Sequence, residues 1–568
     1  MSETEASRRV SQGAGRESSG PRPEDQDVRS FEAERLPRAL VLLIPLAAAL
    51  AALPGLFGPL LADDYVLLAR LVDRPLSEVA RAVFWPTAAV GAYRPLTELS
   101  IALDAALWGG APFGLHLGNL LWHVACALLC SALVRALVPP RPVVALVAGL
   151  LFASHPVHGD AIFQVGARAD LLVTCLMLAS LILFLRGGGV DRRRRPTLAS
   201  LAVFAAALLC KESALVLPLL VVLLDLAAPT GERLGRRLRA GLPRYLWYAG
   251  VLAAYVAFRL VVVRGAPLRL PGLGEALFAV GLSLKLLLLP VETHSGVRGG
   301  VVLALSVITL VVAFLRYARM GDRRNMLLAS VWTVLLLMPL LDEPRRVALY
   351  LPSTGLCVFF GIVLGGLVWR RDQEHPVWVR RVGAGGLLLL LVGGVGVLAY
   401  HATVYRRAGA LAQRLVAQLL EARRAAAPAA REVAIANLPA ALTSWAGDQP
   451  LFAAGFPEAL RLVDPGLEAR VLSTLYVKDG ATVRPRARRV RDGALLLEAG
   501  ESAAFSFHRP ELTTGRDRPR VGQELELVGW SVRLEAVERG RVTRLRVTAR
   551  RPPGPVFAWT GARVELVR

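Results

Sequence analysis

The sequence predicts a polytopic α-helical membrane protein of about eleven spans, with one further re-entrant or surface helix and a small C-terminal β-rich domain. Hydrophobic residues make up 54% of the 568 residues and the mean hydropathy is +0.49, values that a soluble protein of this size rarely needs. Apolar runs long enough to cross a hydrocarbon core of about 30 Å recur from Pro37 to about Ala402. From about Glu432 the pattern changes to short segments of alternating polarity, which is typical of strands.

The N-terminal residues 1–35 are rich in Ser, Glu, Arg and Gly and poor in apolar side chains, which predicts a disordered tail. Arginines precede the first apolar run, so the positive-inside rule places this tail in the cytoplasm. The apolar run starts late and no small-residue cleavage pattern follows it. We therefore expect the first span to act as an uncleaved anchor.

The predicted spans alternate across the membrane. They cover residues 36–61, 113–137, 143–153, 171–185, 198–210, 214–226, 245–263, 301–315, 326–341, 347–369 and 382–400. The basic loops at 135–141, 186–195 and 233–244 then all become cytoplasmic, as the positive-inside rule expects. Residues 276–289 are predicted to dip in and return or to lie on the surface, because a full crossing would place the basic loop 316–324 outside.

The same pattern divides the chain into four parts. A transmembrane domain covers residues 36–402, and its first external segment, residues 62–112, contains a predicted interfacial helix at 76–84. Residues 403–431 form a helix, amphipathic at 411–424, and an Ala/Pro linker, and residues 432–568 form the β-rich domain. We expect an integral protein of a bacterial inner membrane with its C-terminal domain in the periplasm.

The formal net charge of +23 is typical of nucleic-acid-binding proteins. Much of the excess lies in short loops between spans, where the positive-inside rule accounts for it, so no nucleic-acid partner is predicted. All five cysteines lie inside predicted spans: Cys126, Cys130, Cys175, Cys210 and Cys357. They indicate neither a disulfide framework nor a cysteine metal site.

On this topology, every conspicuous polar cluster of the hydrophobic part lies on the non-cytoplasmic side. The clusters are Asp63-Asp64, Tyr93 to Thr97, His155 to His158, Arg168 to Asp170, Lys211-Glu212 and Asp342 to Arg346. One chemically rich face and one merely basic face favour an enzyme that works at the non-cytoplasmic surface.

Adjacent carboxylates at Asp63 and Asp64 are suited to act as a base on an acceptor hydroxyl or to hold a metal. The alternative is an ordinary acidic span terminus. His116, Asn119 and His123 share one face of a helix, where interhelical hydrogen bonding is the favoured interpretation.

The external loop at 155–170 is dense in polar side chains. His155 and His158, with a nearby acid, permit a divalent metal, although a polar wall for a sugar or phosphate is the preferred interpretation. Arg168 either contacts a phosphate or pairs with Asp170. No other cofactor is predicted.

Two further charged pairs open predicted spans or loops. Lys211 and Glu212 form either a structural ion pair or a contact to an anionic headgroup. Arg345 and Arg346 offer bidentate donors for a phosphate, or else belong to a charge-balanced loop with the preceding acidic residues.

Taken in order, these motifs resemble the GT-C glycosyltransferases, and within them the transmembrane-and-TPR O-mannosyltransferases. The motifs are Asp63-Asp64, Tyr93-Arg-Pro-Leu-Thr97, Pro112-Phe-Gly-Leu-His116, His155-Pro-Val-His158, Gly166-Ala-Arg-Ala-Asp170, Lys211-Glu212, Leu288-Leu-Pro290 and Tyr350-Leu-Pro-Ser353. The likeness covers roughly residues 36–400. Two departures stand out, because no TPR array follows and because Gly159 precedes Asp160 where a bulkier residue before Glu is expected.

The resemblance implies an inverting transfer of a hexose, mannose-like, from a polyprenyl-phosphate donor to a protein or glycan acceptor. Asp63 or Asp64 would then be the base. Arg94, Arg168, Lys211, Arg345 and Arg346 would stabilise the departing lipid phosphate, with Arg345 and Arg346 preferred. The implied donor site also includes His155, His158, Asp170 and Glu212.

Two other functional classes remain open at this point. A lipid-linked glycan transporter or flippase should place charges near the bilayer midplane and often contains a repeat, and neither pattern is found here. A non-catalytic cell-envelope assembly protein that kept the fold is the other alternative.

Overall fold

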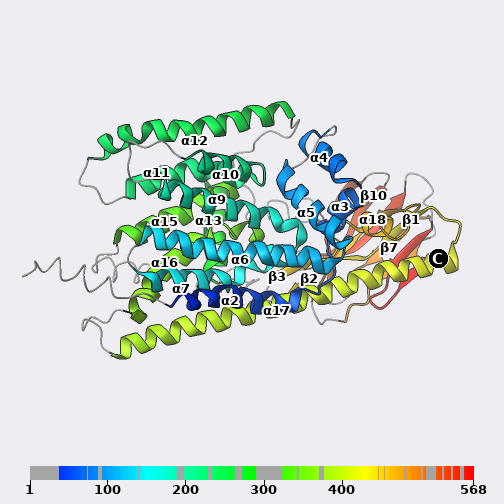
Figure 1. Cartoon of the computed structure of the whole chain (residues 1–568). Coiled ribbons are helices and arrows are strands. Elements are labelled where there is room, and N and C mark those ends of the chain that lie inside the picture. The colour runs from blue at the N-terminus through cyan, green and yellow to red at the C-terminus, as the bar shows by residue number, and fades with distance from the viewer. Residues whose placement is uncertain are drawn as a thin grey trace, which may run out of the picture.

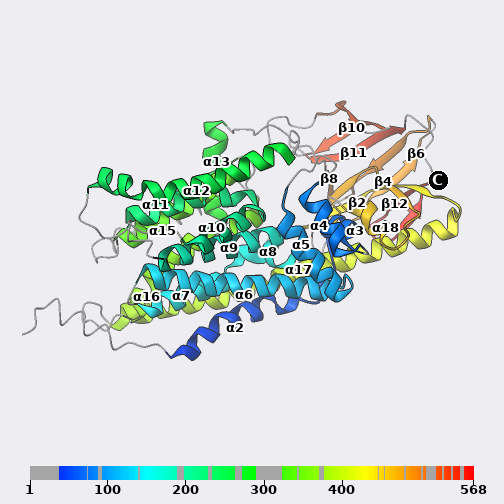
Figure 2. The same cartoon turned by 45° about the horizontal axis from the view of Figure 1, so that its top comes forward.

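Helices of the N-terminal two thirds form a long bundle, and the C-terminal strands lie at one end of it (Figure 1). The computed structural model describes residues 37–72, 74–86, 93–138, 141–187, 197–227, 233–262, 272–289, 323–341, 345–369, 377–444, 447–452, 455–478, 482–490, 492–500, 503–506, 520–527, 530–538, 541–549 and 555–567. Both views place α3, α4 and α5 at the end of the bundle that faces the strands (Figures 1 and 2). Helix α3, which begins with the acidic pair, packs on α18 of the C-terminal part.

The helical part follows the hydropathy pattern closely. Its elements are η1 (Arg38–Leu42), α2 (Leu43–Ala52), η2 (Leu53–Gly55), α3 (Asp63–Leu71), α4 (Leu76–Phe84), α5 (Pro95–Trp108), α6 (Pro112–Leu137), α7 (Pro142–Ala153), η3 (Pro156–His158), α8 (Gly159–Phe163), η4 (Val165–Ala167), α9 (Arg168–Arg186), α10 (Leu198–Leu208), η5 (Glu212–Val216), α11 (Leu217–Ala227), α12 (Leu234–Val262), α13 (Leu273–Leu288), α15 (Arg323–Leu337), η6 (Met338–Leu340), η7 (Arg346–Leu349), α16 (Ser353–Trp369) and α17 (Val377–Ala426). The predicted interfacial helix coincides with α4. The predicted span at 301–315, the tail at 1–35, Asp342 and Glu343 lie outside the described residues.

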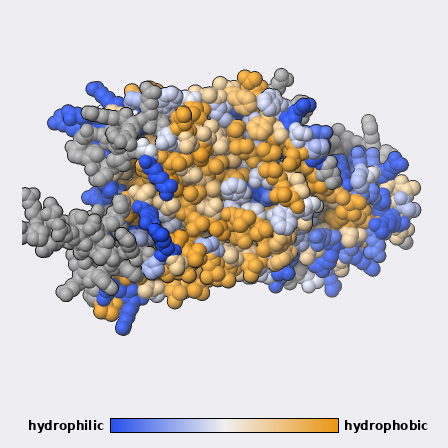
Figure 3. Space-filling view, in the orientation of Figure 1, coloured by the Kyte–Doolittle hydropathy of each residue, from blue (hydrophilic) through white to orange (hydrophobic). Residues whose placement is uncertain are grey.

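A broad hydrophobic surface covers the middle of the bundle, with hydrophilic residues gathered toward its two ends (Figure 3). Among the described helices, five are long and apolar enough to cross a membrane: Arg38–Gly55, Pro112–Leu137, Val165–Arg186, Leu234–Val262 and Val377–Ala426. A sixth candidate is the pair α7 and α8, which is bent by 43° at the break beside His155. The structure is thus largely helical and suited to a membrane, while the total of about eleven spans stays a prediction.

Small residues allow α7 and α16 to pack closely. A Cβ on Gly361 would lie 2.7 Å from the Cβ of Ala148, and one on Gly365 would lie 3.0 Å from the Cα of Val144. Contacts between small residues drive helix association in membranes, because lipid tails remove the hydrophobic driving force between helices. This packing fixes α7, the helix that leads into the loop at 155–170.

Helix α17 leaves the hydrophobic part of the bundle and continues into the C-terminal part. Its 50 residues measure about 75 Å, well over the ~30 Å of a hydrocarbon core. The amphipathic segment predicted at 411–424 is the continuation of this helix, not a separate one. Ala408, Ala412 and Leu415 on it are fully buried against neighbouring elements.

The C-terminal part is rich in strands, as the alternating pattern predicts. Its elements are β1 (Glu432–Ala436), β2 (Leu438–Ser444), β3 (Gly447–Pro450), α18 (Phe456–Arg461), β4 (Glu468–Val471), β5 (Thr474–Lys478), β6 (Arg486–Arg489), β7 (Leu495–Glu498), β8 (Ala503–Ser506), β9 (Glu524–Leu527), β10 (Trp530–Glu538), β11 (Arg541–Ala549), β12 (Val556–Trp559) and β13 (Val564–Leu566). They form three sheets with the orders β13-β12-β1-β4, β6-β7-β11-β10-β9 and β3-β2-β5-β8.

The hydrophobic core of the strands is continuous with that of the helices beside it. One cluster of buried residues joins Leu61 and Ala62 before α3, Leu415 and Leu419 of α17, and strand residues such as Ile435. Helix α18 also packs directly on α3. The strand-rich part is therefore built against α3, the residues just before it, and α17.

Candidate active site

Helix α3 starts at the predicted acidic pair and gives its two carboxylates different environments. Asp64 is only 1% exposed, and both of its oxygens are engaged. The Gly166 amide donates to Oδ1 at 2.8 Å, while the Leu61 amide and the Tyr405 hydroxyl each donate to Oδ2 at 3.2 Å. Burial raises the pKa of Asp64 to about 6, although these three hydrogen bonds lower it. Asp64 therefore ties α3 to the loop before α9 and to α17.

Asp63, in contrast, is exposed at the first turn of α3. Within the described part of the chain, no hydrogen bond or ion pair engages its carboxylate. A base must reach the proton that it abstracts, so an accessible carboxylate suits this role better than one with three internal donors. The geometry therefore separates the two aspartates into an accessible group and an anchoring group.

The segment Gly166 to Asp170 connects three parts of the site. Gly166 bonds Asp64, Arg168 lies in the protein core, and both oxygens of Asp170 accept from Lys211 Nζ at 2.6 Å. Gly166 and Asp170 are four residues apart, so their Cα atoms lie within about 14 Å of each other. The acidic pair and the lysine are thus held by one short stretch of chain.

Arg168 is fully buried and its guanidinium is occupied internally. Nε donates to Asn119 Oδ1 at 2.8 Å, an Nη donates to the Leu115 carbonyl at 2.7 Å, and the other lies 2.6 Å from Asp104 Oδ2. It does not pair with Asp170. The predicted role in phosphate binding has no support in this geometry, because a buried guanidinium with these partners presents no donor to a ligand.

A charge cluster of Arg94, Asp170, Lys211, Glu212 and Arg259 lies where α5, α9, α12 and η5 meet. Arg94 donates to Glu212 at 3.1 Å, and Arg259 donates to the other Glu212 oxygen at 3.1 Å. Three cationic and two anionic groups leave a net charge of +1. The three side chains of the Arg94–Glu212–Arg259 set are 29–31% exposed, so this part of the cluster is open to a ligand.

Backbone contacts hold the cluster in place. The Leu96 amide donates to the Leu209 carbonyl at 3.3 Å, and the Thr97 hydroxyl donates to the Cys210 carbonyl at 3.0 Å, so the start of α5 is fastened to the end of α10. Burial tends to raise the pKa of Glu212, but Arg94 and Arg259 bring it below its ordinary value. Glu212 is therefore an anion at neutral pH that holds two guanidinium groups side by side.

The two histidines of the 155–158 loop belong to helix packing. His158 is fully buried, with its Nε2 2.8 Å from the Ser353 hydroxyl and its ring 4.3 Å from that of Tyr350. His155 Nδ1 accepts from the Val157 amide in its own turn. Among the described residues, no group of three or more His, Cys, Asp or Glu side chains is arranged to hold a metal.

The helical face of His116, Asn119 and His123 makes the predicted interhelical hydrogen bonds. Asn119 donates to the Gln164 carbonyl at 2.9 Å, and His123 Nδ1 lies 2.7 Å from the Tyr350 hydroxyl. His116 Nε2 lies 3.1 Å from the Gly58 carbonyl. These polar groups hold α6 to Gly58, which follows η2, to Gln164 between α8 and η4, and to Tyr350.

The two arginines at the start of η7 differ in exposure. Arg345 is exposed, whereas Arg346 is 9% exposed. Element η7 packs against η3, α8 and α13, so both arginines lie at the side of the loop that contains His155. Both make further contacts within the protein.

A buried polar contact joins α8, α17 and β3. Gln449 Nε2 lies 2.5 Å from His401 Nε2, which is 3.5 Å from Asp160 Oδ1. A Cβ on Gly159 would lie 1.8 Å from His401 Nδ1, so only glycine fits beside this ring. The glycine at position 159, where the resemblance to the O-mannosyltransferases predicts a bulkier residue, therefore has a steric cause.

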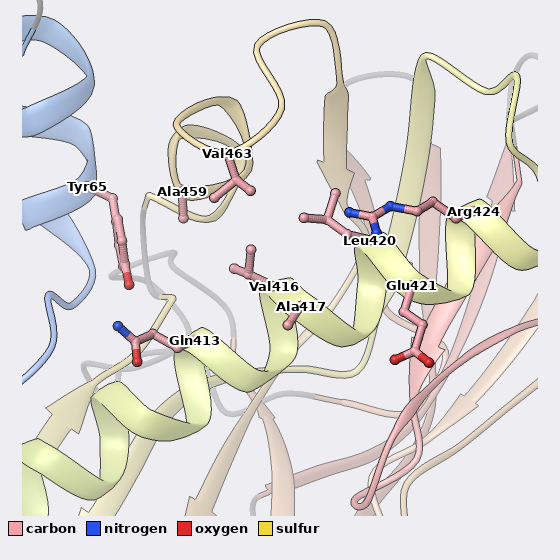
Figure 4. Close-up of a pocket in the computed structure, with 9 residues that line it drawn as sticks. All are labelled: Tyr65, Gln413, Val416, Ala417, Leu420, Glu421, Arg424, Ala459 and Val463. Atoms are coloured by element: carbon pink, nitrogen blue, oxygen red, sulfur yellow. The ribbon is translucent and has the colours of Figure 1, made fainter.

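A pocket opens between α3, α17 and α18 (Figure 4). Tyr65 of α3 points toward Gln413 of α17 in this view, and Ala459 and Val463 lie opposite Val416 and Leu420. Glu421 and Arg424 add charged groups along α17. Burial and the neighbouring Asp64 charge raise the pKa of Tyr65 to about 12, so its hydroxyl stays protonated at neutral pH.

Several residues of the site were not predicted from the sequence. They are Asp104, Arg259, His401, Tyr405 and Gln449. A signal existed for Arg259, because a charged residue at the end of the apolar run of α12 needs a partner or a wet surface. The others contact partners far away in the chain, and no local pattern marks them.

Comparison with known proteins supports the likeness suggested by the motifs. The chain is 37% identical over 164 residues to protein O-mannosyl-transferase Tmtc1 of Drosophila melanogaster, which covers 28% of this chain and 19% of that protein. It is similar to the protein O-mannosyl-transferases. The predicted resemblance is thus confirmed. The chain is also 32% identical over 145 residues to human protein O-mannosyl-transferase TMTC3, a match that covers 24% of this chain and 16% of that protein. The chain spans about a fifth of the length of these curated relatives.

No protein-family model matches the chain. Solved structures to which the chain is similar include the archaeal oligosaccharyltransferase AglB from Archaeoglobus fulgidus, with a TM-score of 0.43, 10% identity, and coverage of 82% of this chain and 75% of that one. ArnT from Cupriavidus metallidurans bound to undecaprenyl phosphate aligns with a TM-score of 0.38, 17% identity, and coverage of 78% and 93%.

Proposed function

We propose that this protein is a membrane glycosyltransferase of the GT-C type. It moves a hexose, mannose-like, from a polyprenyl-phosphate donor to an acceptor hydroxyl at the extracytoplasmic face. The observation that carries the proposal is the difference between the two adjacent aspartates: Asp63 is accessible, while Asp64 is buried and hydrogen-bonded. They lie in a chain similar to the protein O-mannosyl-transferases. The open part of the charge cluster lies at the same end of the bundle and adds cationic groups for a phosphate.

Asp63 is the proposed base. As the acceptor oxygen attacks the anomeric carbon from the side opposite the phosphate, its proton passes to the Asp63 carboxylate. The bond between the anomeric carbon and the phosphate oxygen breaks, and its electron pair leaves with the polyprenyl phosphate. The configuration of the anomeric carbon is inverted in this single displacement.

Arg94 and Arg259 are the proposed partners of the departing phosphate. Glu212 holds them side by side, and their partial exposure lets them turn donors toward a ligand. Charge that develops on the leaving group is stabilised by cations already in place. Lys211 is less suited, because Asp170 occupies it, and Arg345 and Arg346 remain a second proposed donor contact.

Asp64 and Arg168 are proposed to position the site without touching the donor. Asp64 fixes the first turn of α3, and Arg168 fixes α6 to the loop before α9. His155 and His158 are assigned the same kind of role through the packing around Tyr350.

The acceptor is proposed to approach from the pocket lined by Tyr65, Gln413 and Arg424, because this opening adjoins α3 (Figure 4). Its mixture of apolar and polar groups is compatible with a peptide or a glycan. In this proposal the membrane is a bacterial inner membrane, residues 1–35 are cytoplasmic, and residues 432–568 form a periplasmic domain.

Sugar transfer from a radiolabelled polyprenyl-phosphate hexose, measured in membranes, tests the proposal. Wild type should transfer label, and Asp63→Asn should lower the rate by about 10²–10⁴-fold at equal expression. Arg94→Met serves as a matched variant at the phosphate side and should mainly raise the donor KM. Activity that is indifferent to Asp63→Asn would contradict the assigned base.

A further inference from the structure

The residue before the proposed base has a strained backbone. Ala62 has φ +44° and ψ −114°, a conformation that residues with a Cβ rarely adopt. It is 5% exposed and directly precedes Asp63, which starts α3. Such a conformation persists only where the surrounding structure enforces it. The neighbours of Ala62 must therefore hold it in this conformation.

The contacts come from the strand-rich part of the chain. The Ala62 amide donates to the Leu451 carbonyl at 2.9 Å. Gly455 lies against the other side of the same residue, since a Cβ there would be 2.2 Å from the Ala62 oxygen and 3.4 Å from the Tyr65 Cβ. Both polar groups of the Ala62 backbone are thus in close contact with the C-terminal part.

Aromatic packing extends this contact into α3. The Phe452 ring stacks on Tyr65 with centroids 6.2 Å apart and an interplanar angle of 27°, and Phe456 meets Phe452 edge-on at 4.8 Å. Phe452 and Phe456 are 2% and 1% exposed, so these rings are core residues. We call Leu451, Phe452 and Gly455 the clamp residues.

We propose that the clamp residues are positioning residues for the base: the strand-rich part holds Ala62 in its strained conformation and so aims the first turn of α3, with Asp63, at the acceptor. This inference rests on the proposed function. A backbone rotation at Ala62 would turn α3 at its first residue, and a displacement of about 1 Å at a reacting group costs about a hundredfold in rate. The C-terminal part is then a component of the active site as well as a folded appendage.

Three glycines of the C-terminal part provide a matched test. Gly455, Gly493 and Gly522 have φ values of +83°, +79° and +87°, so an alanine at any of them carries the same kind of backbone strain. A Cβ at Gly493 or Gly522 meets nothing within 4 Å, whereas a Cβ at Gly455 meets the Ala62 oxygen. The difference between Gly455→Ala and the two control variants therefore reports on the clamp alone.

Two readouts on the full-length protein are needed. Hydrogen exchange of a peptide covering residues 58–67 includes the Ala62 amide, and transfer kinetics give kcat and donor KM separately. For Gly455→Ala we expect exchange at Ala62 to rise about tenfold or more. We also expect kcat to fall about a hundredfold, with donor KM within about twofold of wild type. Gly493→Ala and Gly522→Ala should match wild type in both.

Phe452→Leu is a milder variant that keeps an apolar side chain in the core but removes the ring beside Tyr65. It should change both readouts in the same direction, and it decides the matter if Gly455→Ala does not fold. The inference would be overturned if the clamp variants showed the same hydrogen exchange at Ala62 and the same kcat as the control variants Gly493→Ala and Gly522→Ala. A wild type that transfers no sugar would count against the proposed function, while exchange at Ala62 would still test whether the clamp residues hold this loop.

Discussion

Replacement of Asp64 by Asn should remove a specific pH dependence from the stability of the protein. The pKa of Asp64 is about 6 in the folded state, against an ordinary value of 3.8. Between these values the folded chain keeps the proton that the unfolded chain has lost. The free energy of unfolding therefore falls as pH rises from about 4 to about 6, and levels off above that. At about 1.4 kcal/mol per pKa unit, the loss over this window is about 3 kcal/mol.

The assay is unfolding of the purified protein in detergent, followed by circular dichroism at pH values from about 4 to about 7. Asp63→Asn is the matched control, because it removes the adjacent carboxylate, which is exposed. The stability of Asp64→Asn relative to wild type should rise by about 3 kcal/mol across this range. Asp63→Asn should stay close to wild type, because the Asp63 charge is the smallest of the causes that shift the pKa of Asp64. Parallel curves for wild type and Asp64→Asn would refute the assignment of a buried, anchored carboxylate.

Three further predictions test other parts of the site. Arg168→Met should destabilise the fold by about 3–5 kcal/mol, because it leaves Asp104 and Asn119 without their partner, and a thermal shift no larger than that of Arg94→Met would contradict this. Arg259→Ala should raise the donor KM about tenfold through loss of one charge-assisted contact, whereas Glu212→Gln, which releases both arginines, should lower the donor KM. Steady-state transfer assays that give both variants the donor KM of wild type would argue against the phosphate site. Gly159→Ala should lower the free energy of unfolding by about 1–3 kcal/mol, because the added methyl group overpacks against His401. In thermal unfolding, the double variant with His401→Ala should regain most of that loss, and a double variant as unstable as the single one would disprove the steric explanation.

The architecture was largely predictable because hydropathy is a property of consecutive residues. Helices occur at each predicted span within the described residues, and α4 has the predicted bounds. Helices α3 and α5 were not predicted, since residues 62–112 lack a long apolar run and pack by tertiary contacts instead. The strands β9 and β11 coincide with segments of period two, but the order of strands in the three sheets depends on long-range pairing.

The site was predictable in its residue types but not in their roles. Asp64 is held by Tyr405, 341 positions away, and His123 by Tyr350, 227 positions away. A local interpretation paired Arg168 with Asp170, but residues two apart lie on different sides of a helix, so Arg168 turns to Asp104. These distant partners determine which groups remain accessible to a ligand, so accessibility could not be predicted from the local sequence.

The central proposal is an inverting sugar transfer with Asp63 as the base. The anomeric configuration of the product tests it most directly. Product formed by wild type from a polyprenyl-phosphate hexose of known configuration would be analysed with anomer-specific glycosidases, beside Asp63→Asn. Wild type should give a product of the opposite configuration, and Asp63→Asn should give none above background. A product that retains the donor configuration, or one formed equally well by Asp63→Asn, would contradict it.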